Sequence, residues 1–229
     1  MKIVVTVAAG VETVWDALRD REKIRHWHGW EYEGGLEAEI EQIYFTRATE
    51  EGTTLRLANG DEFFVEAVQG GSRVTLTRAP LGADPDWDAY YDDVTEGWIT
   101  FLHQLRFAVE RHPREARHTL FYSGTGALSP LTELDVPAQE AGTTYELELA
   151  GQPAKGEIWY TSDHQAGLTV DAWGNGLLVL SHIPPGEQKP DGAAMAILSV
   201  YGDTDLDELG AHWSAWWSER YPEALNLPT

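Results

Sequence analysis

The spacing of apolar residues changes from strand-like to helical within the first part of the chain. Lys2–Val7 alternates weakly, which is typical of a β-strand. Val11, Val14, Trp15 and Leu18 then follow at the i, i+3, i+4, i+7 spacing of one helix face. Asp20 is a suitable N-cap for a second short helix that runs through about Trp27. The pattern predicts a strand followed by two short helices.

From Leu36 the apolar spacing shifts to a period of two, which predicts successive antiparallel strands. Gly-rich turns separate them, because glycine and asparagine tolerate positive φ. The predicted strands are Leu36–Tyr44, Thr53–Leu57, Glu62–Val68 and Arg73–Arg78.

A long helix is predicted over Tyr91–Arg111, ended by Pro113. Its apolar stripe consists of Trp98, Phe101, Leu102, Leu105 and Val109.

The second half repeats this order with shorter helical content at its start. Ser129–Leu134 predicts one helical turn, Gly174-Asn175-Gly176 predicts a hairpin, and Leu206–Arg220 predicts the final helix. The predicted strands are His118–Tyr122, Thr144–Leu149, Glu157–Tyr160, Leu168–Trp173, Leu177–Ile183 and Ala194–Tyr201.

The two long helices end alike, on Glu-Arg-His-Pro at 110–113 and Glu-Arg-Tyr-Pro at 219–222, and each follows an acidic run. This repetition predicts two related domains, 1–115 and 116–229, the second reduced because it lacks the paired short helices. The expected fold class is α+β. Each unit is expected to be a curved antiparallel sheet wrapped on a long C-terminal helix.

The first half resembles the START-like (SRPBCC) helix-grip superfamily. It is most similar to the bacterial family named after the activator of the heat-shock chaperone ATPase. The resemblance rests on Val14-Trp15-Asp16-Ala17-Leu18, on Trp27, and on Gly97-Trp98 with Phe101, Leu102 and Leu105. It implies a helix-grip fold, and the second half resembles a degenerate copy. These motifs are packing positions, so the resemblance says little about function.

Composition narrows the function classes. Hydrophobic residues make up 42% of the chain, enough for a packed core, and there is no cysteine for disulfides or thiolate chemistry. The net charge is -22, which disfavours nucleic acids and anionic membranes and leaves a basic protein partner as one alternative. No apolar run reaches the ~20 residues of a membrane helix. We expect a cytoplasmic protein.

Ten Trp, nine Tyr and six Phe predict either an aromatic core or an aromatic-lined cavity. A bent sheet does not touch a straight helix along its whole length, so the expected cavity lies between them. Phe63 and Phe64 alternate, so only one of them can face it. The pocket candidates are Trp15, Trp27, Tyr44, Phe45, Phe63, Trp98, Phe101, Trp159, Trp173, Trp213 and Trp217.

Trp213, Trp216 and Trp217 cluster on one turn of the final helix. We expect them to seal an interface between the two halves. Contact with a partner protein is the alternative.

Motifs for metal, nucleotide or nucleophilic chemistry are weak. His26 and His28 are two residues apart and point different ways on a helix, and Ser162-Asp163-His164 is no triad by sequence. The Asp84-Asp86-Asp88 and Asp203-Asp205-Asp207 runs lack the glycine and glutamate of a calcium loop and fit helix N-termini better. We therefore expect no cofactor, no metal and no catalytic residue.

Three functions stay open. The first is a non-catalytic protein that binds a hydrophobic or aromatic small molecule between sheet and helix. The second is a chaperone-accessory interaction module. The third is an enzyme that resembles polyketide aromatase/cyclases, which needs polar groups inside an apolar cavity. Candidates for such groups are Tyr44, Arg56, His103 and Arg106.

Overall fold

The computed structural model describes residues 1–32, 34–80, 91–137, 139–186 and 189–222. The chain forms two compact units, Met1–Ala116 and Arg117–Thr229. Within the described residues, no helix is both long enough and apolar enough to cross a membrane. Of the two acidic runs, Asp84-Asp86-Asp88 lies outside the described residues.

The first unit begins with a strand and two short helices, as the sequence predicts, and ends with the long helix. Its elements are β1 (Lys2–Val7), α1 (Val11–Arg19), α2 (Arg21–Arg25), α3 (Leu36–Ile40), a π-helical turn (Glu41–Phe45), β2 (Thr49–Glu51), β3 (Thr54–Arg56), β4 (Glu62–Val68), β5 (Gly71–Thr77) and α5 (Tyr91–Arg111). Asp20 ends α1 and caps α2, where its side chain accepts from the backbone N–H groups of Glu22 and Lys23.

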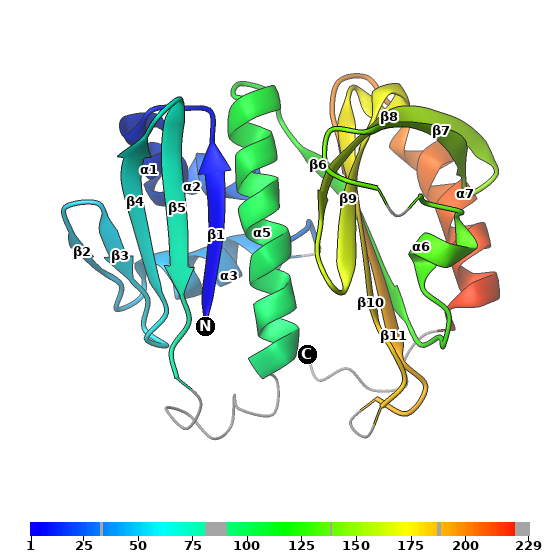
Figure 1. The fold of residues 1–229 in the computed structure, drawn as a ribbon, viewed down its shortest axis with the longest axis horizontal. Helices are drawn as coiled ribbons and strands as arrows, with labels where there is room; N and C mark the ends of the chain where they lie inside the picture. The colour runs from blue at the N-terminus through cyan, green and yellow to red at the C-terminus, as the bar shows by residue number, and fades with distance from the viewer. Residues whose placement is uncertain (33, 81–90, 138, 187–188, 223–229) are drawn as a thin grey trace. The chain divides into compact units, whose positions relative to one another are not determined.

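The first sheet is antiparallel with the strand order β1-β5-β4-β3-β2. Alternate residues of each strand point into the core, so Phe63 is buried while its neighbour Phe64 is exposed. Helix α5 runs beside β1 (Figure 1). It packs Trp98, Leu102 and Leu105 into the same core.

The predicted strand at Leu36–Tyr44 was wrong: this segment is α3 followed by the π-helical turn. Its buried residues are Leu36, Ile40 and Tyr44, which are four apart, so they share one helix face. The intervening Glu and Ala are good helix formers, and Ala38, midway between Leu36 and Ile40, makes the start of the segment look alternating.

The second unit follows the same plan with a larger sheet. Its elements are β6 (His118–Gly124), α6 (Pro130–Glu133), β7 (Thr144–Leu149), β8 (Gln152–Thr161), β9 (Gln165–Val170), a 3₁₀ turn (Asp171–Trp173), β10 (Gly176–Ile183), β11 (Ala193–Val200) and α7 (Leu206–Arg220). Where the first unit has paired short helices, the described residues between β6 and β7 form only the single turn α6, with Ser129 as its cap.

The second sheet has the order β6-β11-β10-β9-β8-β7, so in both units the first strand pairs with the last strand and the others follow in reverse order. Helix α7 lies against this sheet (Figure 1). Its residues Leu209, Trp213 and Trp217 pack into the core of the unit. The chain is therefore an α+β protein of tandem helix-grip units, each an antiparallel sheet with a long C-terminal helix.

The predicted strand at Leu168–Trp173 is shorter in the structure, where β9 ends at Val170. Asp171–Trp173 turn into a 3₁₀ helix because Gly174 and Asn175 both adopt positive φ, and their N–H groups bond to the Asp171 carbonyl. The turn places Trp173 beneath α7.

Candidate functional site

Four predicted pocket residues of the first unit form a packed aromatic cluster. Trp27, Tyr44, Phe63 and Trp98 are all buried. The ring centroids of Trp27 and Tyr44 are 5.7 Å apart, those of Phe63 and Trp98 are 5.3 Å apart, and both pairs meet edge to face. Their contacts are those of a filled core between the sheet and α5.

The other three candidates of this unit lie partly buried at the margin of the same core. Phe45 lies under the guanidinium group of Arg21, whose central carbon is 3.8 Å from the ring centroid. Phe101 lies 4.5 Å from the His28 ring, and Trp15 packs on the core from α1.

A buried hydrogen-bonded chain links Glu39, His28 and Tyr44. The carboxylate can only accept, so His28 Nε2 donates to Glu39 Oε1 at 3.2 Å. Burial, together with the charge of Glu39, raises the pKa of Tyr44 well above its usual range. The Tyr44 phenol therefore keeps its proton and donates to His28 Nδ1 at 2.9 Å.

Glu39 also accepts a hydrogen bond from the hydroxyl of Tyr32 at 3.1 Å. Burial alone would raise the pKa of Glu39, but the hydrogen bonds from His28 and Tyr32 outweigh it and lower this pKa. The Tyr44 end of the chain is enclosed by the rings of Trp27, Phe63 and Trp98. These hydrogen bonds therefore fix the positions of His28 and Tyr44 within the core of the first unit.

A buried ion pair joins the β3–β4 turn to α5. Arg78 Nε lies 3.1 Å and 3.2 Å from the two carboxylate oxygens of Asp61, and both side chains are almost fully buried. Asp61 also accepts from the indole N–H of Trp98 at 3.1 Å and the backbone N–H of Ala79 at 2.8 Å. Arg78 donates to Thr95 Oγ1 at 2.6 Å, so the pair is well satisfied.

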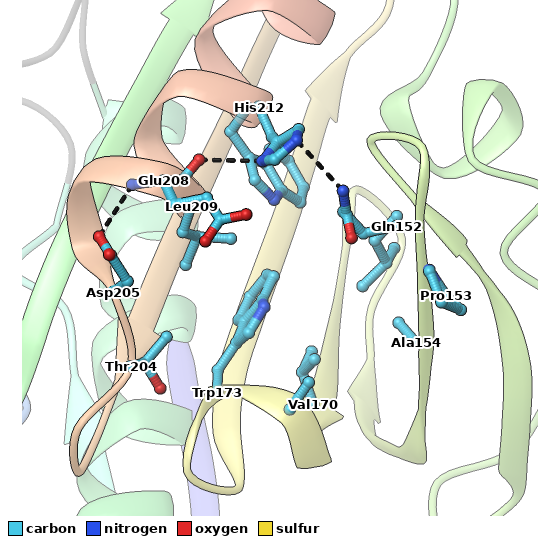
Figure 2. Close-up of a pocket in the computed structure, with 13 residues that line it drawn as sticks. Gln152, Pro153, Ala154, Val170, Trp173, Thr204, Asp205, Glu208, Leu209 and His212 are labelled. Carbon is cyan, nitrogen blue, oxygen red and sulfur yellow. Dashed lines mark hydrogen bonds between the residues drawn. The ribbon is translucent and has the colours of Figure 1, made fainter.

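The second unit contains a cavity of about 230 Å³ between α7 and one end of its sheet. The β7–β8 hairpin, the turn after β9 and the N-terminal half of α7 border it, and it is open to solvent (Figure 2). Its apolar lining is Leu149, Pro153, Ala154, Val170, Ala172, Trp173, Leu209 and Trp213. Its polar lining is Gln152, Thr204, Asp205, Glu208 and His212.

The polar lining residues are bonded to one another and to the backbone. His212 Nδ1 lies 3.0 Å from the carbonyl oxygen of Glu208, which can only accept, so Nδ1 carries a proton. His212 Nε2 lies 3.2 Å from the amide nitrogen of Gln152, which donates to it (Figure 2). Both imidazole nitrogens are thus engaged, and the ring is a neutral bridge between α7 and the hairpin.

Asp205 and Thr204 hold the start of α7. Asp205 Oδ1 accepts from the backbone N–H groups of Asp207 and Glu208 at 3.1 Å and 3.0 Å. The Thr204 hydroxyl donates to the Tyr201 carbonyl at 3.2 Å.

Of the four pocket candidates in the second unit, Trp173 and Trp213 line the cavity. Trp217 is buried in the core under α7, and Trp159 is buried on β8 away from the cavity lining. The expectation that the tryptophans of α7 serve an interface was wrong for Trp213 and Trp217. They pack inside the second unit itself, because α7 turns this face onto its own sheet.

Sequence reasoning missed the polar lining of the cavity. Glu208 and His212 are four residues apart and lie next to Leu209 and Trp213, so the helical period could have placed them on the edge of the buried face. No sequence pattern places Gln152 at the cavity, because only the fold of the β7–β8 hairpin brings it there.

The four polar residues considered for catalysis do not line this cavity. Tyr44 is enclosed in the first core, and Arg56 is half-exposed and paired with Glu62 and Glu51.

The other two lie on α5. Arg106 donates to Glu110 at 3.3 Å, while burial, with the charge of Arg106, lowers the pKa of His103 to about 3. Among the described residues, no group of three or more His, Asp or Glu side chains is arranged to hold a metal ion.

Comparison with known proteins gives similarity to solved structures only. No protein-family model matches the chain, and no curated protein matches it. The chain is similar to DynU16, a protein of the dynemicin biosynthetic locus, at 16% identity and a TM-score of 0.35, over 95% of this chain and 94% of that chain.

It is also similar to two di-domain ARO/CYC proteins. StfQ, from the steffimycin biosynthetic pathway, is 11% identical with a TM-score of 0.37, over 96% of this chain and 92% of that chain. BexL, from the BE-7585A biosynthetic pathway, is 13% identical with a TM-score of 0.33, over 92% of this chain and 88% of that chain. Similarity at this level is too low to transfer a ligand or a reaction.

Proposed function

We propose that the protein binds a small hydrophobic or aromatic molecule in the cavity of the second unit, between its sheet and α7. The observation that carries this proposal is the wall formed by Trp173 and Trp213, two buried indoles that face a lining of aliphatic side chains. Flat apolar surface with a few polar groups at one side is the usual composition of a small-molecule site.

The size of the cavity limits the ligand. Its volume of about 230 Å³ is below the range of roughly 300–1,000 Å³ that holds drug-sized molecules. A compound of one or two fused rings fits this space better than a polycyclic one.

His212 of the cavity lining is not available as a general base. A general base needs a free lone pair within reach of the substrate. Both nitrogens of His212 are used in hydrogen bonds to Glu208 and Gln152. This imidazole positions the helix against the hairpin and has no lone pair left to accept a proton.

Calorimetric titration with 3-methylindole tests the proposal. Ala172 lines the cavity and is exposed, so Ala172→Phe adds bulk at the site without disturbing the core. Ala215→Phe is the matched control, because Ala215 is exposed on α7 outside the cavity lining. We expect saturable binding by the wild type and the control and its loss in Ala172→Phe. Equal binding by all three, or none by the wild type, contradicts the proposal.

Two alternatives have less support. A chaperone-accessory role, as the resemblance of the first half to the activator family implies, needs an exposed contact surface, but Trp213 and Trp217 are buried. An enzyme resembling polyketide aromatase/cyclases needs polar groups at an apolar cavity, and Asp205, Glu208 and His212 are such groups in this lining. Recovery of a bound ligand in chemically altered form would favour the enzyme.

A further inference from the structure

We propose that the cavity ligand is a small aromatic amine, with its ring against Trp173 and Trp213 and its ammonium group beside the carboxylate of Glu208. This inference rests on the proposed function and narrows it to one chemical class. Figure 2 shows Glu208 and His212 on α7, Trp173 below them on the turn after β9, and Gln152 across from His212 on the hairpin.

The polar lining offers mainly hydrogen-bond acceptors. The Thr204 hydroxyl and His212 Nδ1 already donate to backbone carbonyls. Gln152 uses one amide N–H on His212 and keeps its other N–H and its carbonyl oxygen. The carboxylates of Asp205 and Glu208 only accept at neutral pH. A ligand that brings N–H donors matches this set better than one that brings acceptors.

Charge at the site points the same way. Among the described residues that line the cavity there is no Lys or Arg, whereas Asp205 and Glu208 are both acidic. The half of the chain from 116 to 229 carries 4 Lys and Arg against 16 Asp and Glu. An anionic ligand would meet repulsion, and a cationic ligand would meet attraction.

The start of α7 does not reverse this preference. A helix N-terminus attracts anions through its free N–H groups. Here the carboxylate of Asp205 already occupies the N–H groups of Asp207 and Glu208 and brings a negative charge to the same end. The Asp205 carboxylate therefore counters the positive N-terminal end of the α7 dipole.

The indole walls favour a cation as well. A cation within about 6 Å of an indole centroid is attracted to the face of the ring. Trp173 and Trp213 both line the cavity, with ring centroids 5.9 Å apart in an edge-to-face arrangement. An aromatic ammonium compound can use both the apolar surface and the quadrupole of the ring.

Three indoles with different side-chain charges separate these contributions. Tryptamine, 3-methylindole and indole-3-propionate share one ring and differ in having a positive, a neutral or a negative side chain. In calorimetric titrations of the full chain, we expect tryptamine to bind about two- to five-fold more tightly than 3-methylindole, the range of an exposed ion pair. We expect indole-3-propionate to bind most weakly. Added salt should reduce the differences in affinity among the three indoles.

Glu208→Gln tests the assigned carboxylate, and Glu146→Gln is the matched control. Glu146 is exposed on β7 and lies outside the cavity lining, so it changes the net charge by the same amount. We expect Glu208→Gln to remove the preference for tryptamine, so that this variant binds tryptamine and 3-methylindole with equal affinity. Glu146→Gln should leave the tryptamine preference intact.

The outcomes distinguish the two proposals. Suppose that 3-methylindole binds and that Ala172→Phe removes this binding. Only the amine inference is then overturned if tryptamine binds the wild type no more tightly than 3-methylindole does. It is likewise overturned if tryptamine still binds more tightly than 3-methylindole in Glu208→Gln. If none of the three indoles binds the wild type, the proposed function fails and the amine inference fails with it.

Discussion

Trp173 and Trp213 meet edge to face, with ring centroids 5.9 Å apart and ring planes at 73°. The first comes from the 3₁₀ turn after β9 and the second from α7, so their contact fastens the helix to the end of the sheet. Trp213 also stacks on Tyr122 of β6 at 6.1 Å. The same two rings thus hold the second unit together and line its cavity.

Trp213→Ala should destabilise the protein strongly, because the side chain is buried among these rings. Removing a buried tryptophan costs about 3–5 kcal/mol in the free energy of unfolding. Trp216→Ala is the control: this ring is only partly buried and lies under Arg220, so the loss should be clearly smaller. Urea unfolding of both variants measures the difference. Equal losses would mean that Trp213 is not a core residue.

Asp61→Asn should destabilise far more than Glu62→Gln, although the two carboxylates are neighbours. Asp61 is buried against Arg78, and the variant removes the negative charge of this buried ion pair, which costs about 3–5 kcal/mol. Glu62 pairs with Arg56 at the surface, where such pairs contribute up to about 1 kcal/mol. Urea unfolding measures the loss of unfolding free energy in each variant. A smaller loss in Asp61→Asn than in Glu62→Gln would refute the assignment of Asp61 and Arg78 as a stabilising buried ion pair.

The stability of the first unit should depend on the ionisation of Glu39. Its pKa is lowered in the folded protein from the ordinary value of 4.5, so the folded state binds its proton less readily than the unfolded state. The stabilisation is therefore fully present above pH 4.5 and is lost as the pH falls through the lower folded value. Glu39→Gln removes this contribution, so its stability deficit relative to the wild type should shrink on acidification.

The measurement is the free energy of unfolding of wild type and Glu39→Gln from neutral to acidic pH. Glu146→Gln, an exposed carboxylate on β7, is the control and should track the wild type throughout. A deficit for Glu39→Gln that stays constant, or grows as the pH falls, would show that Glu39 is not stabilised by its hydrogen bonds from His28 and Tyr32.

Elements with a long, clean period were predictable from the sequence. The final helix begins and ends at the predicted Leu206 and Arg220, since an Asp cap precedes it and a proline follows. The segment Leu36–Tyr44 was misread because a short run of apolar and acidic residues fits both periods. Only the burial of Leu36, Ile40 and Tyr44 on one face decides between them.

The site was predictable only where it overlaps the core. Trp173 and Trp213 were candidates because large aromatics mark buried surface. Gln152 and His212 are sixty residues apart in sequence, and their hydrogen bond exists only because the β7–β8 hairpin folds over α7. No local pattern in the chain encodes that approach, so the polar half of the cavity could not be inferred from sequence.

A crystal structure of the protein soaked with 5-bromoindole tests the central claim most directly, because bromine reveals its own position by anomalous scattering. The account predicts a bromine peak inside the second unit, between Trp173 and Trp213 on one side and Gln152 on the other. The same soak of Ala172→Phe should show no peak there. A peak only elsewhere in the molecule, or an unchanged peak in Ala172→Phe, would contradict the account.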